Sequence, residues 1–569
     1  MVNKKNDLSI VLCGEAGQGI KTVEIALTRI LKFAGFNVFA TKEYMSRIRG
    51  GANSTEIRIS SGPIQSYVDR IDLLIPLNRG TAMKQSDRFS DETIVIGEKD
   101  SIEEVEDLVG PAFEVAFEDI AKEIGKKIYS NIVAVGVVCG ILDVDKEIVR
   151  NYLIDRFSEK SEEVIQGNID AAEKGFDIGE EFRNSEKISI VLESSDDPKD
   201  QILINGAEAV SLGAIAGGCN VVTSYPMSPS TAVLVFLSQH WKEFEIFAEQ
   251  AEDEISAVNM AIGAWYGGGR AMITTSGGGF ALMEEGISLA GIIESPLVMH
   301  LAQRPGPGTG LPTRTEQGDL LLALNAGHGE FPRFILTPGN LEECFYLAAK
   351  AFNLADKYQV PVMIITDQYL LDSYYNIDNL PSDKIKPEKF FIKTEQDYKR
   401  FKLTGDGISP RGIPGYGDGL VKADSDEHDE AGFITEDFDV RVDMVDKRLK
   451  KFEAMKEDHQ DPVLIGDENY ETLVIGWGST RNVISEALCR MNREGVAQLH
   501  FPQVFPLPQK GIDYLEKADK TIIIENNATG QFGQILKLHA DFICDNEIHQ
   551  YNGLPFSVEK IVEELEEIL

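Results

Sequence analysis

The sequence has no cysteine spacing that suits a metal cluster. Its 569 residues include six cysteines, all far apart: Cys13, Cys139, Cys219, Cys344, Cys489 and Cys544. Iron–sulfur clusters and zinc sites need closely spaced thiolates, so we expect no cluster in this chain. Cysteines in apolar runs such as SIVLC and AVGVVCGIL are typical of small buried side chains in a reducing compartment.

Positive charge and long apolar runs are also scarce. Lys and Arg number 55 against 93 Asp and Glu, for a net charge of -38, which disfavours nucleic acid and anionic membranes as partners. No apolar run approaches a membrane span, and the one near the N-terminus is too short for a signal-peptide core. We therefore expect a cytoplasmic protein.

The length and the apolar pattern predict an α/β fold in three domains. Residues 8–13 form an apolar strand, a helix should run to about Ala34, and 36–40 form the next strand, a βαβ opening that implies a parallel sheet. The polar stretch 193–200 is typical of a linker. The expected parts are a first domain at 1–192, a second at 200–375, an irregular connecting segment at 376–462, and a smaller α/β domain at 463–569.

A glycine-rich loop follows the first strand. Gly14, Gly17 and Gly19 stand at a strand-to-helix turn, where backbone N–H groups can approach an anion. The order G-x-x-G-x-G departs from the dinucleotide fingerprint, and Ile20 separates the last glycine from Lys21, so a Walker loop fails too. With Glu43 some twenty residues on, a dinucleotide site and a turn that serves packing alone both stay open.

A proline-rich turn follows the predicted strand at 221–224. It reads Tyr225-Pro-Met-Ser-Pro-Ser230, and ligands of open α/β sheets bind at the carboxyl ends of strands. The alternative is a proline-stiffened turn in which Ser230 caps the next helix.

This turn resembles the Tyr-Pro-Ile-Thr-Pro-Ser motif of 2-oxoacid:ferredoxin oxidoreductases, in the form of the alpha subunit with the gamma domain fused in front. The resemblance spans essentially the whole chain, but Met227 and Ser228 replace the family's isoleucine and threonine, which leaves substrate preference open. The other similar stretches are Gly14 to Gly19, Ser46-Arg-Ile-Arg-Gly-Gly51, Gln250-Ala-Glu-Asp-Glu254, the loop from Gly306 through Arg314 to Asp319, and Glu525-Asn-Asn-Ala-Thr-Gly-Gln-Phe-Gly533.

The resemblance implies thiamine diphosphate as cofactor, with one carboxyl of this chain beside N1′ of its aminopyrimidine. In similar enzymes this glutamate opens a helix that has small residues seven and nine positions later. Glu254 has Ala261 and Gly263 there, whereas Glu252 has a poorer match, so Glu254 is the prediction and Glu252 the reserve. Four acids compete for the role: Glu249, Glu252, Asp253 and Glu254.

The resemblance also implies that Arg314 grips the carboxylate of a 2-oxoacid, since a guanidinium binds carboxylates bidentately. Ser228 would donate to the same end of the substrate, in the turn with Tyr225 and Pro226. Arg304 is the competing arginine.

The magnesium motif of thiamine enzymes is missing. Gly-Asp-Gly occurs at 405–407 and 417–419, but no asparagine follows at the required distance. We therefore expect a beta subunit to bring magnesium, the diphosphate site and a 4Fe-4S cluster, in an (alpha-beta)2 heterotetramer. By the same resemblance the gamma domain would receive coenzyme A, with the N-terminal glycine loop and the turn Arg47 to Gly51, including Arg49 and Gly50, as contacts. The third domain resembles the transketolase C-terminal type.

The predicted reaction converts a 2-oxoacid, coenzyme A and oxidised ferredoxin to acyl-coenzyme A, carbon dioxide and reduced ferredoxin. 2-Oxoglutarate is the preferred substrate, with pyruvate and branched-chain oxoacids open. Because ferredoxins are acidic as well, this acidic chain is a poor docking surface for the carrier. Two rivals remain: a non-catalytic scaffold subunit and an NAD-dependent dehydrogenase that uses the N-terminal loop.

Overall fold

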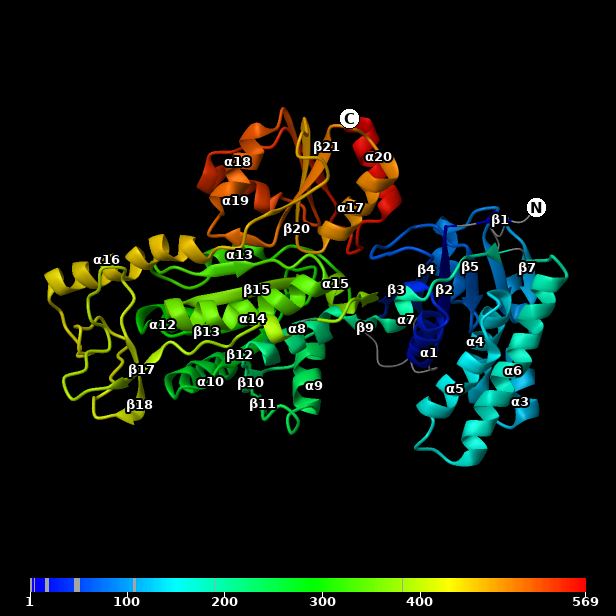
Figure 1. Cartoon of the computed structure of the whole chain (residues 1–569), viewed down its shortest axis with the longest axis horizontal. Coiled ribbons are helices and arrows are strands. Elements are labelled where there is room, and N and C mark those ends of the chain that lie inside the picture. The colour runs from blue at the N-terminus through cyan, green and yellow to red at the C-terminus, as the bar shows by residue number, and fades with distance from the viewer. Residues whose placement is uncertain are drawn as a thin grey trace. The chain divides into compact units, whose positions relative to one another are not determined.

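The computed structural model describes residues 3–4, 6–15, 20–45, 52–105, 109–188, 190–380 and 382–569. The chain forms two compact units (Figure 1): Met1–Ile204 with Asp372–Asn379 and Ser557–Glu559, and Asn205–Leu371 with Leu380–Phe556 and Lys560–Leu569. The predictions for Gly17, Gly19, Arg49, Gly50 and Gly51 fall outside the described residues and stay predictions.

The first unit is built on a mixed sheet, so the parallel sheet expected from its opening is only partly right. Strand β4 lies between β2 and β3 and runs antiparallel to both. The sequence of β4 is polar, yet Glu56 and Arg58 are buried in ion pairs with Arg88 and Asp7, which offsets the cost of burying their charges. In sheet order the strands are β7 (Ala112–Glu114), β6 (Ile94–Gly97), β5 (Leu73–Pro76), β2 (Asp7–Glu15), β4 (Ala52–Ser60), β3 (Asn37–Glu43), β16 (Tyr374–Ile377) and β9 (Ile202–Asn205).

Helices cover this sheet, and the apolar run at 132–141 is one of them. It forms α4, which is buried on all sides and packs closely on α6 through glycines: a Cβ at Gly136 would lie 2.2 Å from the carbonyl oxygen of Ala172. The predicted linker holds a short helix, and Ser195 N donates to Gly35 O at 2.8 Å. The helices are α1 (Ile20–Phe33), α2 (Lys99–Glu103), α3 (Phe117–Ile124), α4 (Ser130–Ile141), α5 (Lys146–Arg156), α6 (Glu162–Asn184) and α7 (Asp197–Asp200); a two-stranded pair joins β1 (Asn3–Lys4) and β8 (Ile190–Val191).

The second unit contains a seven-stranded sheet that is parallel except for β22 at one end. Every residue of β13 and β15 is buried, as expected where helices cover both faces of a parallel sheet. The α/β fold class predicted from the sequence is confirmed. The order is β11 (Phe247–Gln250), β10 (Val221–Ser224), β12 (Ala271–Thr275), β13 (Leu297–Gln303), β15 (Pro361–Asp367), β14 (Phe334–Leu336) and β22 (Gln503–Phe505).

Eight helices accompany these strands: α8 precedes β10, α15 follows β15, and the other six lie between consecutive strands in the sequence. Helix α10 contacts β10 and β12, and α14 packs on α8 and β15. They are α8 (Gly206–Ala216), α9 (Thr231–Gln239), α10 (Glu254–Tyr266), α11 (Gly277–Leu282), α12 (Glu284–Ile292), α13 (Leu320–Asn325), α14 (Leu341–Tyr358) and α15 (Gln368–Asp372).

A five-stranded sheet near the C-terminus completes the second unit, with α18 and α19 on one side and α17 and α20 on the other (Figure 1). Strand β22 directly follows β21 in the chain but pairs with β14, so it belongs to the seven-stranded sheet. Its elements are β19 (Val463–Ile465), β21 (Val496–Phe501), β20 (Thr472–Trp477), β23 (Lys520–Glu525), β24 (Asn546–His549), α17 (Thr480–Met491), α18 (Gln509–Lys517), α19 (Gln531–Ala540) and α20 (Val558–Ile568).

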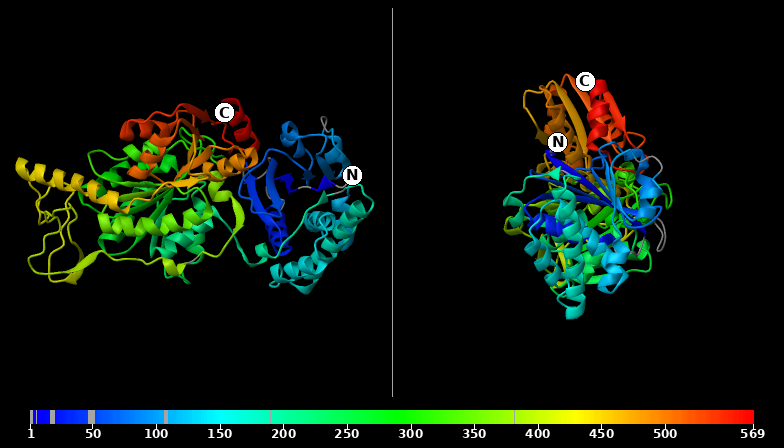
Figure 2. Two further views of the ribbon diagram at one scale, coloured as in Figure 1. Left: turned by 45° about the horizontal axis from the view of Figure 1, so that its top comes forward. Right: turned by 90° about the vertical axis from the view of Figure 1, so that its right-hand side faces the viewer.

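From Leu380 on, the connecting segment forms an arm at one end of the second unit (Figure 2). It was expected to be largely irregular, but it contains the strands β17 (Phe391–Thr394) and β18 (Arg411–Gly417) and the long helix α16 (Phe438–Met455). Among the described helices, none is long and apolar enough to cross a bilayer.

Candidate functional site

The predicted site residues of the second unit, together with a run of three glycines that was not predicted, follow four neighbouring parallel strands. Ser228 follows β10, Glu254 follows β11, the glycines at 277–279 follow β12, and Arg304 and Arg314 follow β13. Because the carboxyl ends of parallel strands meet at one edge, these segments share the edge where open α/β sheets bind ligands.

Glu254 is the first residue of α10, and Asp253 caps the helix by accepting a hydrogen bond from Ser256 N at 2.7 Å. Glu254 is 3% exposed, whereas Glu249 and Glu252 are exposed and Asp253 is half-buried. Burial thus distinguishes Glu254 from the three competing acids and agrees with the choice made from the sequence.

The turn at 276–279 gathers buried polar atoms that lack partners. Glu254 Oε1, Ser276 Oγ and Asp319 Oδ2 have no hydrogen-bond partner among the described residues. A Cβ at Gly279 would lie 2.5 Å from Glu254 Oε1, and one at Gly277 would lie 2.5 Å from Asp319 Oδ2. Because buried polar atoms normally have partners, orphaned atoms around one glycine turn indicate where polar atoms of a ligand would bind.

The small residues used to choose Glu254 lie on different faces of α10. Ala261 is fully buried in the core, whereas Gly263 is exposed and a Cβ there would meet nothing within 4 Å. The residue that closely approaches the Glu254 carboxylate is Gly279, which the sequence pattern did not single out.

Ser228 and Arg304 are linked. Arg304 Nη1 donates to the carbonyl oxygen of Ser228 at 2.7 Å, and burial lowers the pKa of Arg304, with the charge of Asp319 opposing that shift. Arg304 therefore fastens the turn that carries Ser228, which makes it the weaker candidate for a substrate carboxylate.

The other residues of this turn differ in exposure and in hydrogen bonding. Tyr225 is exposed, Pro226 is half-buried, and Ser230 Oγ donates to Met227 O at 2.7 Å. Ser230 precedes α9 but makes no side-chain hydrogen bond to the helix, so the helix-cap alternative is wrong.

Arg314 is half-buried in the loop between β13 and α13. Its backbone N–H donates to Leu311 O at 3.1 Å. A Cβ at Gly553 would lie 3.3 Å from Arg314 Cβ, so the stem of the arginine packs on the C-terminal segment of the same unit.

Asp319 is a site residue to which sequence reasoning gave no role. Burial raises the pKa of its carboxyl to about 6, the charge of Glu316 adds to the rise, and Arg304 opposes it. The backbone N–H of Asp319 donates to Gln303 Oε1 at 2.9 Å. The sequence feature that could have indicated Asp319 is its position, as an acid at the end of the glycine- and proline-rich loop.

A buried histidine on the central strand β13 bonds to both neighbouring strands of the sheet. His300 lies 2.8 Å from the hydroxyl oxygens of both Thr274 and Thr366, and burial lowers its pKa to about 3. His300 is therefore neutral, and it links β12, β13 and β15 through side-chain hydrogen bonds.

In the first unit, Gly14 lies in β2. A Cβ there would lie 2.9 Å from Ile20 Cδ1 and 3.1 Å from Asn78 Oδ1, and Asn78 Oδ1 accepts a hydrogen bond from Glu15 N at 3.0 Å. Close packing thus explains a glycine at position 14.

The cysteines were expected to be small buried side chains, and four of the six are buried. Burial raises the pKa of the Cys13, Cys139 and Cys219 thiols to about 12, so these side chains are protonated. Cys489 is exposed and Cys544 half-buried. Among the described residues, no group of three or more His, Cys, Asp or Glu side chains is arranged to hold a metal ion.

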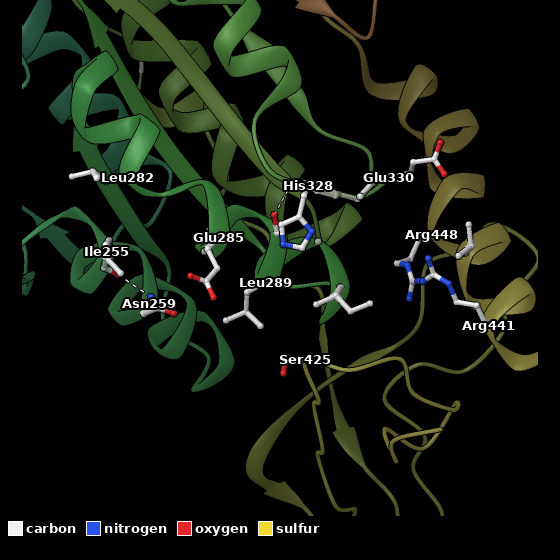
Figure 3. Close-up of a pocket in the computed structure, with 17 residues that line it drawn as sticks. Ile255, Asn259, Leu282, Glu285, Leu289, His328, Glu330, Ser425, Arg441 and Arg448 are labelled. Carbon is white, nitrogen blue, oxygen red and sulfur yellow. Dashed lines mark hydrogen bonds between the residues drawn. The ribbon is translucent and has the colours of Figure 1, made fainter. Parts of the chain in front are cut away.

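A cavity of about 600 Å³ opens beside α10 and α12 (Figure 3). Ile255 and Asn259 line one side, and Arg441 and Arg448 of α16 line the other. Glu254, Ser228 and Arg314 are not part of its lining, so this cavity is separate from the predicted site.

Two family models match the chain. The one described as "Pyruvate flavodoxin/ferredoxin oxidoreductase, thiamine diP-bdg" covers residues 212–447, which include the glycine turn and Glu254. The one described as "Pyruvate ferredoxin/flavodoxin oxidoreductase" covers residues 9–178.

The relatives span the whole chain. A 2-oxoacid:ferredoxin oxidoreductase alpha subunit from a Sulfolobus species is 32% identical over 99% of this chain and 96% of its own. The 2-oxoglutarate oxidoreductase subunit KorA of Mycobacterium tuberculosis is 27% identical over 97% and 90%. The solved structure of the Magnetococcus marinus 2-oxoglutarate:ferredoxin oxidoreductase, with 2-oxoglutarate, coenzyme A and succinyl-CoA bound, matches with a TM-score of 0.93 at 30% identity, covering 99% of both chains. This chain therefore belongs to the 2-oxoacid:ferredoxin oxidoreductase family, as an alpha subunit.

Proposed function

We propose that this alpha subunit takes part in the oxidative decarboxylation of 2-oxoglutarate with coenzyme A to succinyl-coenzyme A, carbon dioxide and reduced ferredoxin. The observation that carries the proposal is Glu254, a buried carboxylate at the start of α10 whose Oε1 is orphaned against Gly279. A non-catalytic scaffold would not need a buried acid without a partner, because such a group costs stability.

The residues at the glycine turn fit the pyrimidine half of thiamine diphosphate. Glu254 Oε1 would hold a proton at N1′ of the aminopyrimidine, which is general acid–base work for a carboxyl group. The open space beside Gly278, where a Cβ would have only Gly308 O within 4 Å, suits close approach of a flat ring. Thiamine diphosphate, when bound, supplies the carbon nucleophile that attacks the oxo group and accepts the electron pair left by carbon dioxide.

Arg314 and Ser228 would bind the substrate. Arg314 would hold the carboxylate that leaves as carbon dioxide, and Ser228, with Tyr225 and Pro226 in the same turn, would orient the oxo end. Arg304 supports Ser228 by holding its carbonyl oxygen. Preference for 2-oxoglutarate is supported by the substrates in the names of the M. tuberculosis and M. marinus proteins. Pyruvate and branched-chain oxoacids are the alternatives.

The proposal requires a beta subunit that brings the diphosphate site, magnesium and a 4Fe-4S cluster, in an (alpha-beta)2 assembly. Apolar side chains near the site are exposed in this chain, among them Ile255 at 47% and Leu282 at 51%, and a docking subunit would bury them. The first unit would receive coenzyme A. The cytoplasmic location expected from the sequence stays a prediction.

The decisive variant is Glu254→Gln, which keeps the side-chain shape but cannot exchange the proton. In the complex reconstituted with the beta subunit, the rate of viologen reduction with 2-oxoglutarate should fall by at least about 100-fold, since positioned acid–base groups contribute roughly 10²- to 10⁴-fold. Assembly, followed by size-exclusion chromatography, should be unchanged.

Glu252→Gln is the matched control, because Glu252 is exposed two residues away. It should keep the activity of the unaltered complex. Full activity in Glu254→Gln, or equal losses in both variants, would remove the assignment. Comparing 2-oxoglutarate with pyruvate in the same assay tests the substrate: a higher kcat/KM for pyruvate would replace 2-oxoglutarate in the proposal.

A further inference from the structure

The loop that carries Arg314 and Asp319 is attached to the C-terminal sheet of its unit. Thr315 N donates to Gly553 O at 3.2 Å, and Gln317 N donates to Asn526 O at 2.7 Å. Gly553 and Asn526 lie more than 200 positions away in sequence. The segment between Arg314 and Asp319 is therefore held by backbone hydrogen bonds to a distant part of the fold.

Gln317 is the centre of this attachment. It is fully buried; its Nε2 donates to Trp477 O at 2.8 Å, and its Oε1 accepts from Asn526 N at 2.9 Å. Its carbonyl oxygen accepts from Asn527 Nδ2 at 3.2 Å. A Cβ at Gly478 would lie 2.9 Å from Gln317 Nε2, so a glycine beside Trp477 allows the close approach. Every polar group of Gln317 has a partner.

Gln531, the first residue of α19, makes a second attachment. Its Nε2 donates to Gly318 O at 2.7 Å, and its Oε1 accepts from Leu321 N at 2.9 Å. These two bonds bracket Asp319. One glutamine side chain therefore fixes the backbone on both sides of the carboxylate that lies against Gly277.

Glu525 stabilises the part of the C-terminal sheet to which the loop is attached. This fully buried carboxylate accepts hydrogen bonds from Phe532 N at 2.9 Å, Gly533 N at 3.0 Å, Trp477 Nε1 at 3.1 Å and Asn527 Nδ2 at 2.8 Å. A negative charge at a helix N-terminus is stabilised by the N–H groups and the dipole there. Glu525 thus fixes the first turn of α19, where Gln531 begins, together with Trp477 and Asn527.

We propose that Gln317 and Gln531, braced by Glu525, are positioning residues that hold Arg314 and Asp319 at the carboxyl edge of the parallel sheet. The inference rests on the proposed role of Arg314. It gives the C-terminal domain a role in catalysis, because the motif at 525–533 of that domain sets the geometry of the loop that carries Arg314 and Asp319. Errors of about 1 Å in such placement can cost on the order of 100-fold in rate.

The test compares Gln531→Ala with Gln534→Ala in the full chain. Gln534 lies three residues further along α19 and is exposed, and its Nε2 donates to Thr529 O, so it makes no bond to the loop. In Gln531→Ala, hydrogen–deuterium exchange of the peptide covering 315–321 should speed up, because Leu321 N loses its acceptor. Gln534→Ala should exchange as the unaltered chain does.

Activity of the reconstituted complex gives the second readout. In Gln531→Ala, kcat/KM for 2-oxoglutarate should fall on the order of 10- to 100-fold, while the KM for coenzyme A stays unchanged. Gln531→Glu keeps the acceptor for Leu321 N and should recover part of the loss. If Gln531→Ala does not fold, Gln531→Glu carries the test through the same two measurements.

Arg314→Ala separates this inference from the proposed function. If Arg314→Ala is strongly impaired while Gln531→Ala matches the unaltered complex, the positioning role is overturned and the function stands. If Arg314→Ala keeps full activity, the substrate role of Arg314 falls, and with it the catalytic purpose assigned to the attachment. Faster exchange at 315–321 with unchanged kcat/KM would also overturn the inference.

Discussion

At the scale of single residues, the fold shifts the pKa of the Asp319 carboxyl group into a range where its titration can be measured. Burial raises its pKa from 3.8 to about 6, and Arg304 only partly offsets this. Its Oδ2 has no partner among the described residues and lies against Gly277. The protonated form is therefore favoured in the folded protein relative to the unfolded chain.

Asp319→Asn should remove a pH dependence of stability. A carboxyl with a raised folded pKa contributes its full stability below the unfolded pKa of 3.8 and loses it as pH rises through about 6. The whole change is at most about 3 kcal/mol, at roughly 1.4 kcal/mol per pKa unit. Urea unfolding of the purified chain between pH 4.5 and 7.5 should therefore show the unaltered chain losing stability relative to Asp319→Asn as pH rises.

Asp443→Asn, which changes an exposed carboxyl on α16, serves as the control and should follow the unaltered chain at every pH. A constant difference between Asp319→Asn and the unaltered chain across this range would contradict the shifted pKa.

At the scale of elements, α16 is held to the second unit by a buried cluster of charges. Lys447 and Lys451 of α16 both form ion pairs with Glu294, and all three side chains are 1% exposed. Arg400 Nη2 donates to the carbonyl oxygen of Glu294 at 2.6 Å. Burial would raise the pKa of Glu294, but Lys451, Lys447 and Arg400 hold it well below its ordinary value. The Glu294 carboxylate thus lies among three buried cations and pairs directly with two of them.

Glu294→Gln should destabilise the arm strongly. Removing one member of a buried ion pair costs about 3–5 kcal/mol because the remaining charges are left uncompensated. The free energy of unfolding should fall by that amount, and the segment 380–460 should become sensitive to limited proteolysis.

The exposed pair of Glu453 with Lys456 offers a comparison on the same helix. Glu453→Gln should change stability by no more than about 1 kcal/mol, as exposed ion pairs do. Similar effects of the two variants would show that the Glu294 cluster does not hold the arm.

At the scale of the whole molecule, the two units are interleaved along the chain. Strand β16 belongs to the sheet of the first unit although nearly all of the second unit's large sheet precedes it in sequence. It pairs with β3, Val38 N donates to Asn376 Oδ1 at 2.7 Å, and Lys42 forms an ion pair with Asp372 at 2.7 Å. The first unit is therefore completed by residues that come long after it.

A single cut inside the first unit should leave the two fragments together. With a protease site inserted after Glu193, the cleaved chain should elute as one species in size-exclusion chromatography, since β16 stays paired with β3. Replacing residues 374–377 by a glycine–serine segment should weaken this association. Fragments of the otherwise unaltered chain that separate without denaturant would contradict the expectation.

The central strands of the seven-stranded sheet in the second unit, such as β13 and β15, were predictable because they are apolar runs buried on both faces. The run at 221–224 is β10, and the run at 297–301 lies in β13. Strand β4 escaped prediction because its buried Glu56 and Arg58 find their partners only in the folded sheet. Likewise, β14 and β22 are too short to stand out, and their pairing joins segments about 170 positions apart.

The sequence by itself determined the α/β class and the family, because both depend on local patterns: apolar periodicity, turn residues and short motifs in a fixed order. It also pointed to Glu254 among four neighbouring acids. Only the tertiary structure decided that Glu254, Ser276 and Asp319 meet at one glycine turn and that Arg304 holds the backbone of Ser228. It also decided that Gln317 and Gln531 fasten the loop between β13 and α13. Burial and hydrogen bonding between distant segments exist only after the chain has packed, so no local pattern encodes them.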